Sequence, residues 1–267
     1  MWYLTSYALE TIHRIVNTCP ILHVSFNVPD SPFSMMLPMI GQMGSFARPS
    51  ADTGDVLDLY LHGYVSSRLM NLSRNNNNNN NNGSTTDSES PSAEGLPVTV
   101  GASHIDGLVL SLTPNSHSYN YRSAVLFGRA TVVTDLAEKL YAMELITDGA
   151  VCRGRYANTR GPPNGAEMQS TTVLRVRVET GSAKIRSGMP SDEKADLADE
   201  SLLDRVWTGV VPVHYTVADP VPGPYNRVEK VPAYLRDFVD EANADARDFA
   251  METATKRMVP KARKGED

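Results

Sequence analysis

The chain has 267 residues, with 25 Lys and Arg against 31 Asp and Glu, a formal net charge of −6 at pH 7. This excess of acid disfavours a nucleic-acid partner, because a polyanion is repelled unless basic residues gather on one surface. Cys19 and Cys152 lie outside any C-x-x-C motif, so neither a disulfide framework nor a zinc site is indicated, and a cytoplasmic setting is expected. Charged residues interrupt the N-terminal apolar stretch, and no run approaches the roughly 18 apolar residues of a membrane span, so no membrane association is expected.

Alternation of apolar and polar residues predicts strands along much of the chain. The predicted strands cover residues 22–28, 57–61, 98–100, 108–112, 123–133, 174–178 and 211–217. Helical spacing covers residues 9–16, 67–72, 136–146 and 233–258, and Thr134 and Asp135 precede the third as N-cap signals. Without βαβ spacing or a G-x-G-x-x-G or Walker motif, this order predicts a mainly β barrel or sandwich with short helices.

A polar stretch with eight consecutive Asn interrupts this pattern. It has almost no apolar side chain with which to offset the entropy of ordering, so residues 73–96 are expected to form a disordered insertion. The insertion would belong to one domain of residues 1–227. Residues 228–267 are expected to form an amphipathic helix and a polar tail, with the helix packed on its own domain or on a second subunit.

The segment LYLHGYVSSRLMNL, residues 59–72, has the outline of an anion site. A predicted strand ends at His62, and a predicted helix begins after Ser66 and Ser67, followed by Arg68. Backbone N–H groups at a helix start, hydroxyl groups and a guanidinium can together bind a phosphate. An ordinary N-cap serine beside a solvated arginine gives the same pattern, so both interpretations stay open.

Three later segments carry polar groups that suit either a ligand or an ordinary turn. Asn120, Arg122 and Ser123 lie in a polar cluster before a strongly apolar strand, and Pro114 and Asn115 ahead of it already indicate a turn. Further along, Lys184 and Arg186 share parity in an extended chain, and Gly209 beside Trp207 would allow another planar group to approach. The scattered histidines form no H-x-x-x-H or H-E-x-x-H motif, so no metal site is expected.

In combination, the motifs resemble the FMN-binding split-barrel superfamily of pyridoxamine-phosphate oxidase, and within it the flavin-nucleotide-binding branch that includes the nitroimidazole-resistance (Nim) proteins. The motifs are residues 7–13, 21–26, 37–39, 59–63 with 67–68, 106–110, 120–123 with 127–128, 182–186 and 207–212. The resemblance spans about residues 7–217. It implies a split β-barrel of Greek-key type with an added C-terminal helix, and a homodimer with a flavin at the subunit interface.

The resemblance also implies roles for particular residues. Residues 36–39 would run beside the flavin ring, and His62, Ser67 and Arg68 would surround its phosphate or ring edge. Arg122 or Lys184 would stabilise charge on the reduced ring. His62 would also be the catalytic acid, unless it only bonds a backbone carbonyl and closes the turn. The complete expected cofactor-binding set is Met36, Leu37, Pro38, Met39, His62, Ser67, Arg68, Asn120, Arg122, Ser123, Lys184 and Trp207.

Two departures narrow the expected activity. Leu69 stands where that family has a lysine after the arginine, and the Arg-x-His that grips pyridoxal phosphate has no counterpart. Vitamin B6 oxidation is therefore not expected, and the main hypothesis is an FMN-dependent oxidoreductase acting on a small molecule. The alternatives are a non-catalytic carrier of flavin, haem or F420 with the same fold, and a barrel that retains only the fold.

Overall fold

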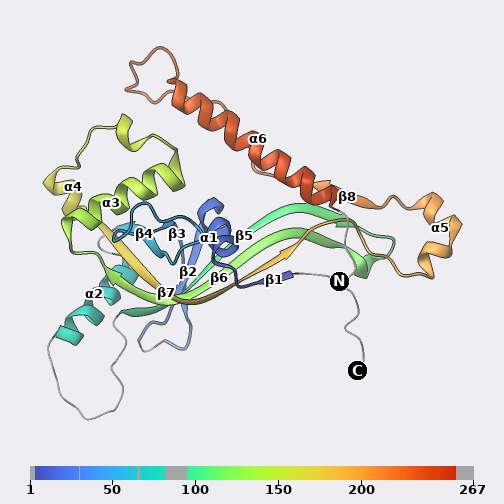
Figure 1. Ribbon diagram of the computed structural model, residues 1–267, viewed down its shortest axis with the longest axis horizontal. Helices are drawn as coiled ribbons and strands as arrows, with labels where there is room; N and C mark the ends of the chain where they lie inside the picture. Colours follow the sequence, from blue (N-terminus) through green and yellow to red (C-terminus); the bar gives the residue numbers. More distant parts are fainter. Residues whose placement is uncertain (1–3, 30, 65–66, 82–94, 257–267) are drawn as a thin grey trace, which may run out of the picture. The chain divides into compact units, whose positions relative to one another are not determined.

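The computed structural model describes residues 4–29, 31–64, 67–81 and 95–256 (Figure 1). The chain divides into two compact units. We call them the barrel unit, which contains residues 6–103 and 123–183, and the extension unit, which contains residues 1–5, 104–122 and 184–267. Residues 184–227 group with the C-terminal helix in this division.

Six strands of the sheet close into a barrel in the order β7, β4, β3, β2, β5 and β6, and β6 pairs in turn with β7. They are β2 (Leu22–Phe26), β3 (Met35–Gly44), β4 (Asp58–Tyr64), β5 (Leu96–Leu110), β6 (Ser118–Val132) and β7 (Thr171–Arg186). Two short strands, β1 (Leu4–Ser6) and β8 (Gly209–Pro212), pair with β7 and β5. This architecture confirms the expected split barrel.

The apolar side of the predicted alternation fills the barrel. Val24 pairs with Val100 between β2 and β5, and Leu61 pairs with Leu174 between β4 and β7. All four side chains are almost completely buried. At Gly41, which pairs with Leu61, an added Cβ would lie 2.6 Å from the backbone oxygen of Tyr60. Only glycine permits this close approach of β3 to β4.

The strand β4 differs from the expected pattern, because it is buried on both faces. Alternation indicated that Tyr60 lies on a polar face, yet its side chain is fully buried beneath α3 (Leu136–Ile146). Its hydroxyl donates to Glu138 Oε1 at 2.9 Å, and Arg175 lies 3.0 Å from the same oxygen. Burial and the carboxylate of Glu138 raise the pKa of Tyr60. The N-cap of α3 is Asp135, as expected, and its side chain accepts from the Glu138 N–H at 2.8 Å.

Further helices agree with the expected positions but not always with the expected lengths. In the barrel unit, α1 (Leu9–Thr18) matches, whereas α2 (Arg68–Asn81) runs on through residues 73–81, which were expected to be disordered. Anchorage by the buried Leu69 and Met70 explains this difference, because adding a residue to an existing helix costs far less than nucleation. Residues 82–94 lie outside the described part, and β5 begins at Leu96.

The short helices are α4 (Gly165–Ser170) and α5 (Glu200–Arg205), with single turns at Pro114–Ser116, Thr147–Val151, Tyr156–Asn158 and Asp196–Ala198. Among the helices of the described ranges, none has the length and apolarity needed to cross a bilayer.

The C-terminal helix α6 (Ala233–Thr255) packs on its own chain within the extension unit. Its buried residues are Ala250, Thr253 and Ala254, and the Gly188 N–H donates to the Thr253 carbonyl at 2.8 Å. Residues 213–217, expected to be strand, continue past the end of β8 and are held to the helix by Asn243. The amide of this residue bonds both the N–H and the carbonyl of Val217, at 2.7 and 2.8 Å.

Glu138→Ala should lower the free energy of unfolding by about 1–3 kcal/mol, because it leaves the buried Tyr60 hydroxyl without an acceptor. Glu144→Ala is the matched control, since Glu144 lies on the same helix with its side chain exposed. Urea denaturation of both variants measures the difference. Equal stability of the two variants would show that the hydroxyl does not need this partner.

Candidate functional site

The start of α2 packs against the end of β4 and the middle of β3. An added Cβ at Gly63 would overlap the Met70 methyl group and lie 3.2 Å from the Met39 methyl group. Met70 is fully buried. The strand end and the helix start that the sequence singled out therefore belong to one packed region, with Met39 of the proposed ring-contacting strand beside it.

Ser67 is the N-cap of α2. Its Oγ accepts weakly from the Met70 N–H at 3.4 Å, and its carbonyl accepts from the Asn71 N–H at 3.0 Å. This geometry is the ordinary capping alternative, yet a capping hydroxyl keeps its own proton free to donate to a ligand. Ser66 lies outside the described residues.

Two arginines of α2 have different environments. Arg68 is exposed and makes no hydrogen bond or ion pair with any described residue. Arg74 is held by Thr172, whose Oγ1 accepts from it at 2.8 Å, and by Asn71 at 3.0 Å. Desolvation and the nearby charge of Arg74 lower the pKa of Lys139, whose ammonium donates to the Thr171 carbonyl at 2.6 Å. Arg68 is thus the cation of this helix that is available to an anion.

His62 lies at the end of β4, opposite Ile40 on β3 and Val173 on β7. Its side chain is exposed, and partial desolvation lowers the pKa of the imidazole below its usual value of 6.5. Among the described residues it makes no hydrogen bond, so the carbonyl contact weighed as its structural role is not seen there. The imidazole is therefore accessible, and its surroundings favour the neutral form.

The outward side chains of β3 form an exposed surface that we call the outer face. It consists of Met36, Pro38 and Ile40 with their cross-strand neighbours Ser25, His23 and His62. Met36 is 60% exposed and Ile40 is 39% exposed. The intervening residues of the expected set, Leu37 and Met39, are half-buried and pair with the buried Val24 and Leu22. An exposed apolar strip of this kind suits a planar ligand or a second subunit.

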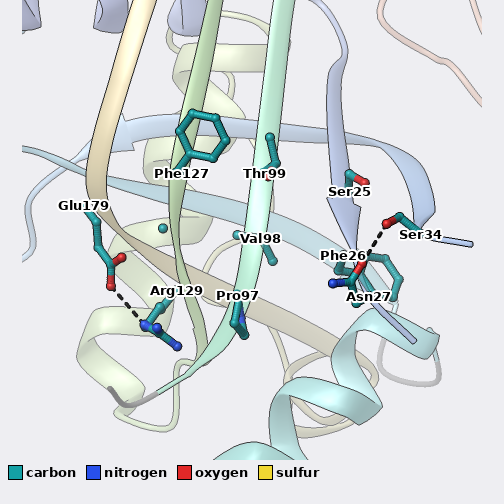
Figure 2. A pocket seen from close by; sticks show the side chains of 11 residues that line it. Ser25, Phe26, Asn27, Ser34, Pro97, Val98, Thr99, Phe127, Arg129 and Glu179 are labelled. Atoms are coloured by element: carbon teal, nitrogen blue, oxygen red, sulfur yellow. Dashed lines mark hydrogen bonds and ion pairs between the residues drawn. The ribbon is translucent and has the colours of Figure 1, made fainter. Parts of the chain in front are cut away.

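A pocket of about 230 Å³ opens on the outside of the barrel (Figure 2). Its lining comes from the end of β2, the start of β5 and adjacent parts of β6 and β7. The lining residues are Ser25, Phe26, Asn27, Ser34, Pro97, Val98, Thr99, Phe127, Gly128, Arg129 and Glu179. Ser25 belongs both to this pocket and to the outer face, so the two adjoin.

In the extension unit, Arg122 is committed to other parts of the protein. Its Nε and Nη2 atoms bond the buried carboxylate of Asp106 at 3.1–3.2 Å, and its guanidinium carbon lies 3.9 Å from the centre of the Phe249 ring. The carboxylate neutralises the guanidinium, and the ring of α6 covers it. A cation that stabilises a reduced flavin would instead keep its N–H donors free for the flavin, so the bonding of Arg122 differs from the role expected for it.

Asn120 is also part of the packing of α6. Its Oδ1 accepts from Arg186 Nη1 at 2.7 Å, and its Nδ2 donates to the Thr253 carbonyl at 3.4 Å. Arg186 is only 5% exposed, and desolvation lowers the pKa of its guanidinium. The internal bonds of Asn120 therefore account for its burial without a ligand.

The remaining residues of the expected set are Lys184, Ser123 and Trp207. Lys184 is exposed, with its ammonium 5.8 Å from the centre of the Tyr121 ring, and Ser123 is half-buried on β6. Trp207 is 65% exposed, and its indole folds over Gly209, where an added Cβ would lie 2.7 Å from the ring. The space expected for another planar group is occupied by this indole itself, and the positive φ of Gly209, 155°, also favours glycine.

The structure thus places the expected residues in two separate groups. Met36, Leu37, Pro38, Met39, His62, Ser67, Arg68 and Ser123 belong to the barrel unit, and Asn120, Arg122, Lys184 and Trp207 belong to the extension unit. Their contacts with a cofactor stay predictions. Within the described ranges, no three His, Cys, Asp or Glu side chains gather as metal ligands.

Sequence reasoning missed Arg74, the pocket, and the contacts of Glu138 with Tyr60 and Arg175. Only Glu138 had a local signal, since it stands three residues after the N-cap Asp135, the spacing of a capping box. Instead of reaching back to the cap, its carboxylate bonds two strands of the barrel. The pocket had no such signal, because its lining comes from four strands that are distant in sequence.

Asp106→Asn should destabilise the extension unit by about 1–3 kcal/mol, because the largely buried Arg122 loses its counter-charge. Amide hydrogen exchange in α6, which covers Arg122 through Phe249, should become faster. The control is Asp237→Asn, an exposed position of the same helix. An unchanged exchange rate in the Asp106 variant would show that the packing of α6 does not depend on this ion pair.

Residues 82–185 match a family model described as pyridoxamine 5'-phosphate oxidase. Two solved structures resemble the chain with a TM-score of 0.66: the flavocytochrome Anf3 from Azotobacter vinelandii, at 26% identity, and an FAD and heme binding protein from Mycobacterium smegmatis, at 25% identity. Each alignment covers 88% of this chain, and 92% and 97% of the respective structures. Among curated proteins, none matches the chain.

Proposed function

Because the chain belongs to the split-barrel superfamily of pyridoxamine-phosphate oxidase, we propose that it binds FMN and uses it to oxidise or reduce a small molecule. Two observations carry the proposal: Arg68 at the start of α2 is uncommitted, and His62 is accessible on the apolar outer face. The two similar structures, one a flavocytochrome and the other an FAD and heme binding protein, support a flavin as the ligand.

The phosphate of FMN would be held at the N-terminus of α2. This helix is 14 residues long, so its first turn presents unpaired backbone N–H groups and the positive end of the helix dipole. Arg68 adds a guanidinium, which binds phosphate oxygens through two parallel hydrogen bonds. The Ser67 hydroxyl supplies a further donor while its lone pairs cap the helix.

The outer face would hold the flat ring. Met36, Pro38 and Ile40 offer apolar contact, and such a strip is costly to leave in water, so a second copy of the chain would cover it. We therefore propose a cytoplasmic homodimer in which the ring lies between subunits. Burial of this kind excludes water from the reacting atoms.

When bound, the flavin supplies the electron chemistry. The protein's own residues hold the phosphate, position the ring and deliver protons. His62 is one of two exposed histidines on the outer face, with His23, and we assign His62 the role of proton donor to a reduced substrate.

The absorbance spectrum of the purified protein, followed by anaerobic titration with NADPH, tests the proposal. A flavin spectrum that bleaches with NADPH and recovers with an oxidising substrate supports an oxidoreductase. A flavin that exchanges no electrons, or a haem Soret band without flavin, would replace it with the carrier alternative. A colourless protein that does not bind added FMN would contradict the proposal and support the alternative in which the chain retains only the fold of the superfamily.

Arg68→Ala should weaken FMN binding by about 1.5–3 kcal/mol, the value of a hydrogen bond to a charged group, without changing the circular dichroism spectrum. Arg153→Ala is the control, since Arg153 is also exposed and its side chain makes no hydrogen bond or ion pair with the described residues. Quenching of flavin fluorescence gives both affinities. Equal affinities would remove the phosphate assignment.

His62→Gln should retain most FMN affinity but slow substrate reduction about 10²-fold, a typical contribution of a general acid. Because the pKa of His62 lies below 6.5, the protonated donor is lost as the pH rises through that lowered value. The wild-type rate should therefore fall with rising pH in the acidic range, and the variant should lack this dependence. Stopped-flow traces of both half-reactions across pH provide the measurement, and unchanged rates would make His62 a structural residue.

A further inference from the structure

We propose that the pocket on the outside of the barrel binds a planar aromatic carboxylate. Two features of the pocket support this ligand: the polar groups that the pocket leaves free, and an exposed aromatic side chain beside them (Figure 2). If the flavin chemistry proposed above holds, this carboxylate would be the substrate, so that part of the inference rests on the proposed function. The binding itself does not, and it can be measured separately.

The acceptors that line the pocket are largely used within the protein. Glu179 Oε1 accepts from Arg129 Nε at 2.9 Å, and Asn27 Oδ1 accepts from the Ser34 hydroxyl at 2.7 Å. Both bonds are drawn in Figure 2. The groups left free include three donors, the two terminal nitrogens of Arg129 and the amide nitrogen of Asn27, beside one carboxylate oxygen, Glu179 Oε2; none of these atoms bonds another described residue. A ligand that satisfies this lining must be rich in acceptor oxygens.

Arg129 specifies the acceptor as a carboxylate. Its Nε is fixed by Glu179, which leaves the two terminal nitrogens side by side as a fork. Such a fork matches the two oxygens of a carboxylate through parallel hydrogen bonds. The ion pair with Glu179 also holds the guanidinium in one orientation before a ligand arrives, which reduces the entropy lost on binding.

Phe127 specifies a flat, apolar body for the ligand. Its ring is 46% exposed on the same strand as Arg129, two residues away, so both side chains leave the barrel on the same side. Pro97, also exposed, provides a second apolar contact on β5. An aromatic ring stacks on phenylalanine better than an aliphatic ring of equal size.

The pocket lies next to the outer face, the surface proposed to hold the flavin ring. Ser25 pairs with Thr99 in the pocket on one side and with Met36 of the outer face on the other. Neighbouring strands lie about 4.8 Å apart. A ligand here would therefore lie one strand from the surface proposed to hold the flavin ring.

Glu179 makes the inference sharply testable, because its negative charge opposes the bound carboxylate. Glu179→Gln should tighten binding of benzoate several-fold, whereas Arg129→Gln should weaken it about tenfold or more. Arg129→Lys retains the charge without the fork and should fall between wild type and Arg129→Gln. Arg177→Gln is the control for surface charge, since Arg177 is exposed on β7 and does not line the pocket.

The experiment is calorimetric titration of the folded protein with benzoate, benzamide and cyclohexanecarboxylate, with and without FMN. The expected order of affinity is benzoate first in both states, and Phe127→Leu should remove the advantage of benzoate over cyclohexanecarboxylate. Equal affinity for benzoate and benzamide, no opposite effects of Glu179→Gln and Arg129→Gln, or absence of benzoate binding would each overturn the proposal. Benzoate binding in a protein that takes up no FMN would retain this site while rejecting the proposed function.

Discussion

The pairing of β6 with β7 is the interaction on which the other features of the barrel depend, because it closes the six main strands into a ring. Glycine makes it possible at one point. A Cβ at Gly128 would overlap the Arg177 carbonyl oxygen and lie 3.0 Å from a Val176 methyl group. One residue further along β6, Arg129 reaches Glu179 across the same seam. Closure therefore brings together the ion pair of the pocket and also fixes β7 beside β4, the strand that carries His62.

Four arginines of this protein differ in their partners according to how deeply they are buried. Arg122 and Arg186 are largely or almost completely buried, so the protein itself supplies a carboxylate to the first and an amide to the second. Arg68 and Arg129 lie nearer solvent and keep donors free. Charge patterning alone does not distinguish these groups. The bonds within the fold distinguish them. Of these four arginines, the two with free donors belong to the barrel unit, so a ligand is expected there and not in the extension unit.

Local sequence predicted the barrel well because alternation records which side of a strand is apolar. It did not predict the burial of Tyr60. In an alternating strand this tyrosine is assigned to the solvent-facing side, and only the fold shows that α3 covers that side. The helix start at Ser67 was also predictable from local sequence, because a serine three residues after the strand end at Tyr64 is a typical N-cap. By contrast, Asp106 and Arg122 lie 16 residues apart and meet only through the fold.

The indole of Trp207, folded over Gly209, has a practical consequence. It is the only tryptophan among the described residues, and the sequence holds one other, Trp2. In a chain with Trp2 replaced by phenylalanine, the tryptophan emission would come from a single indole next to the start of β8. The protein thus carries an intrinsic optical reporter of the extension unit, so its unfolding can be followed separately from events in the barrel without attaching a dye.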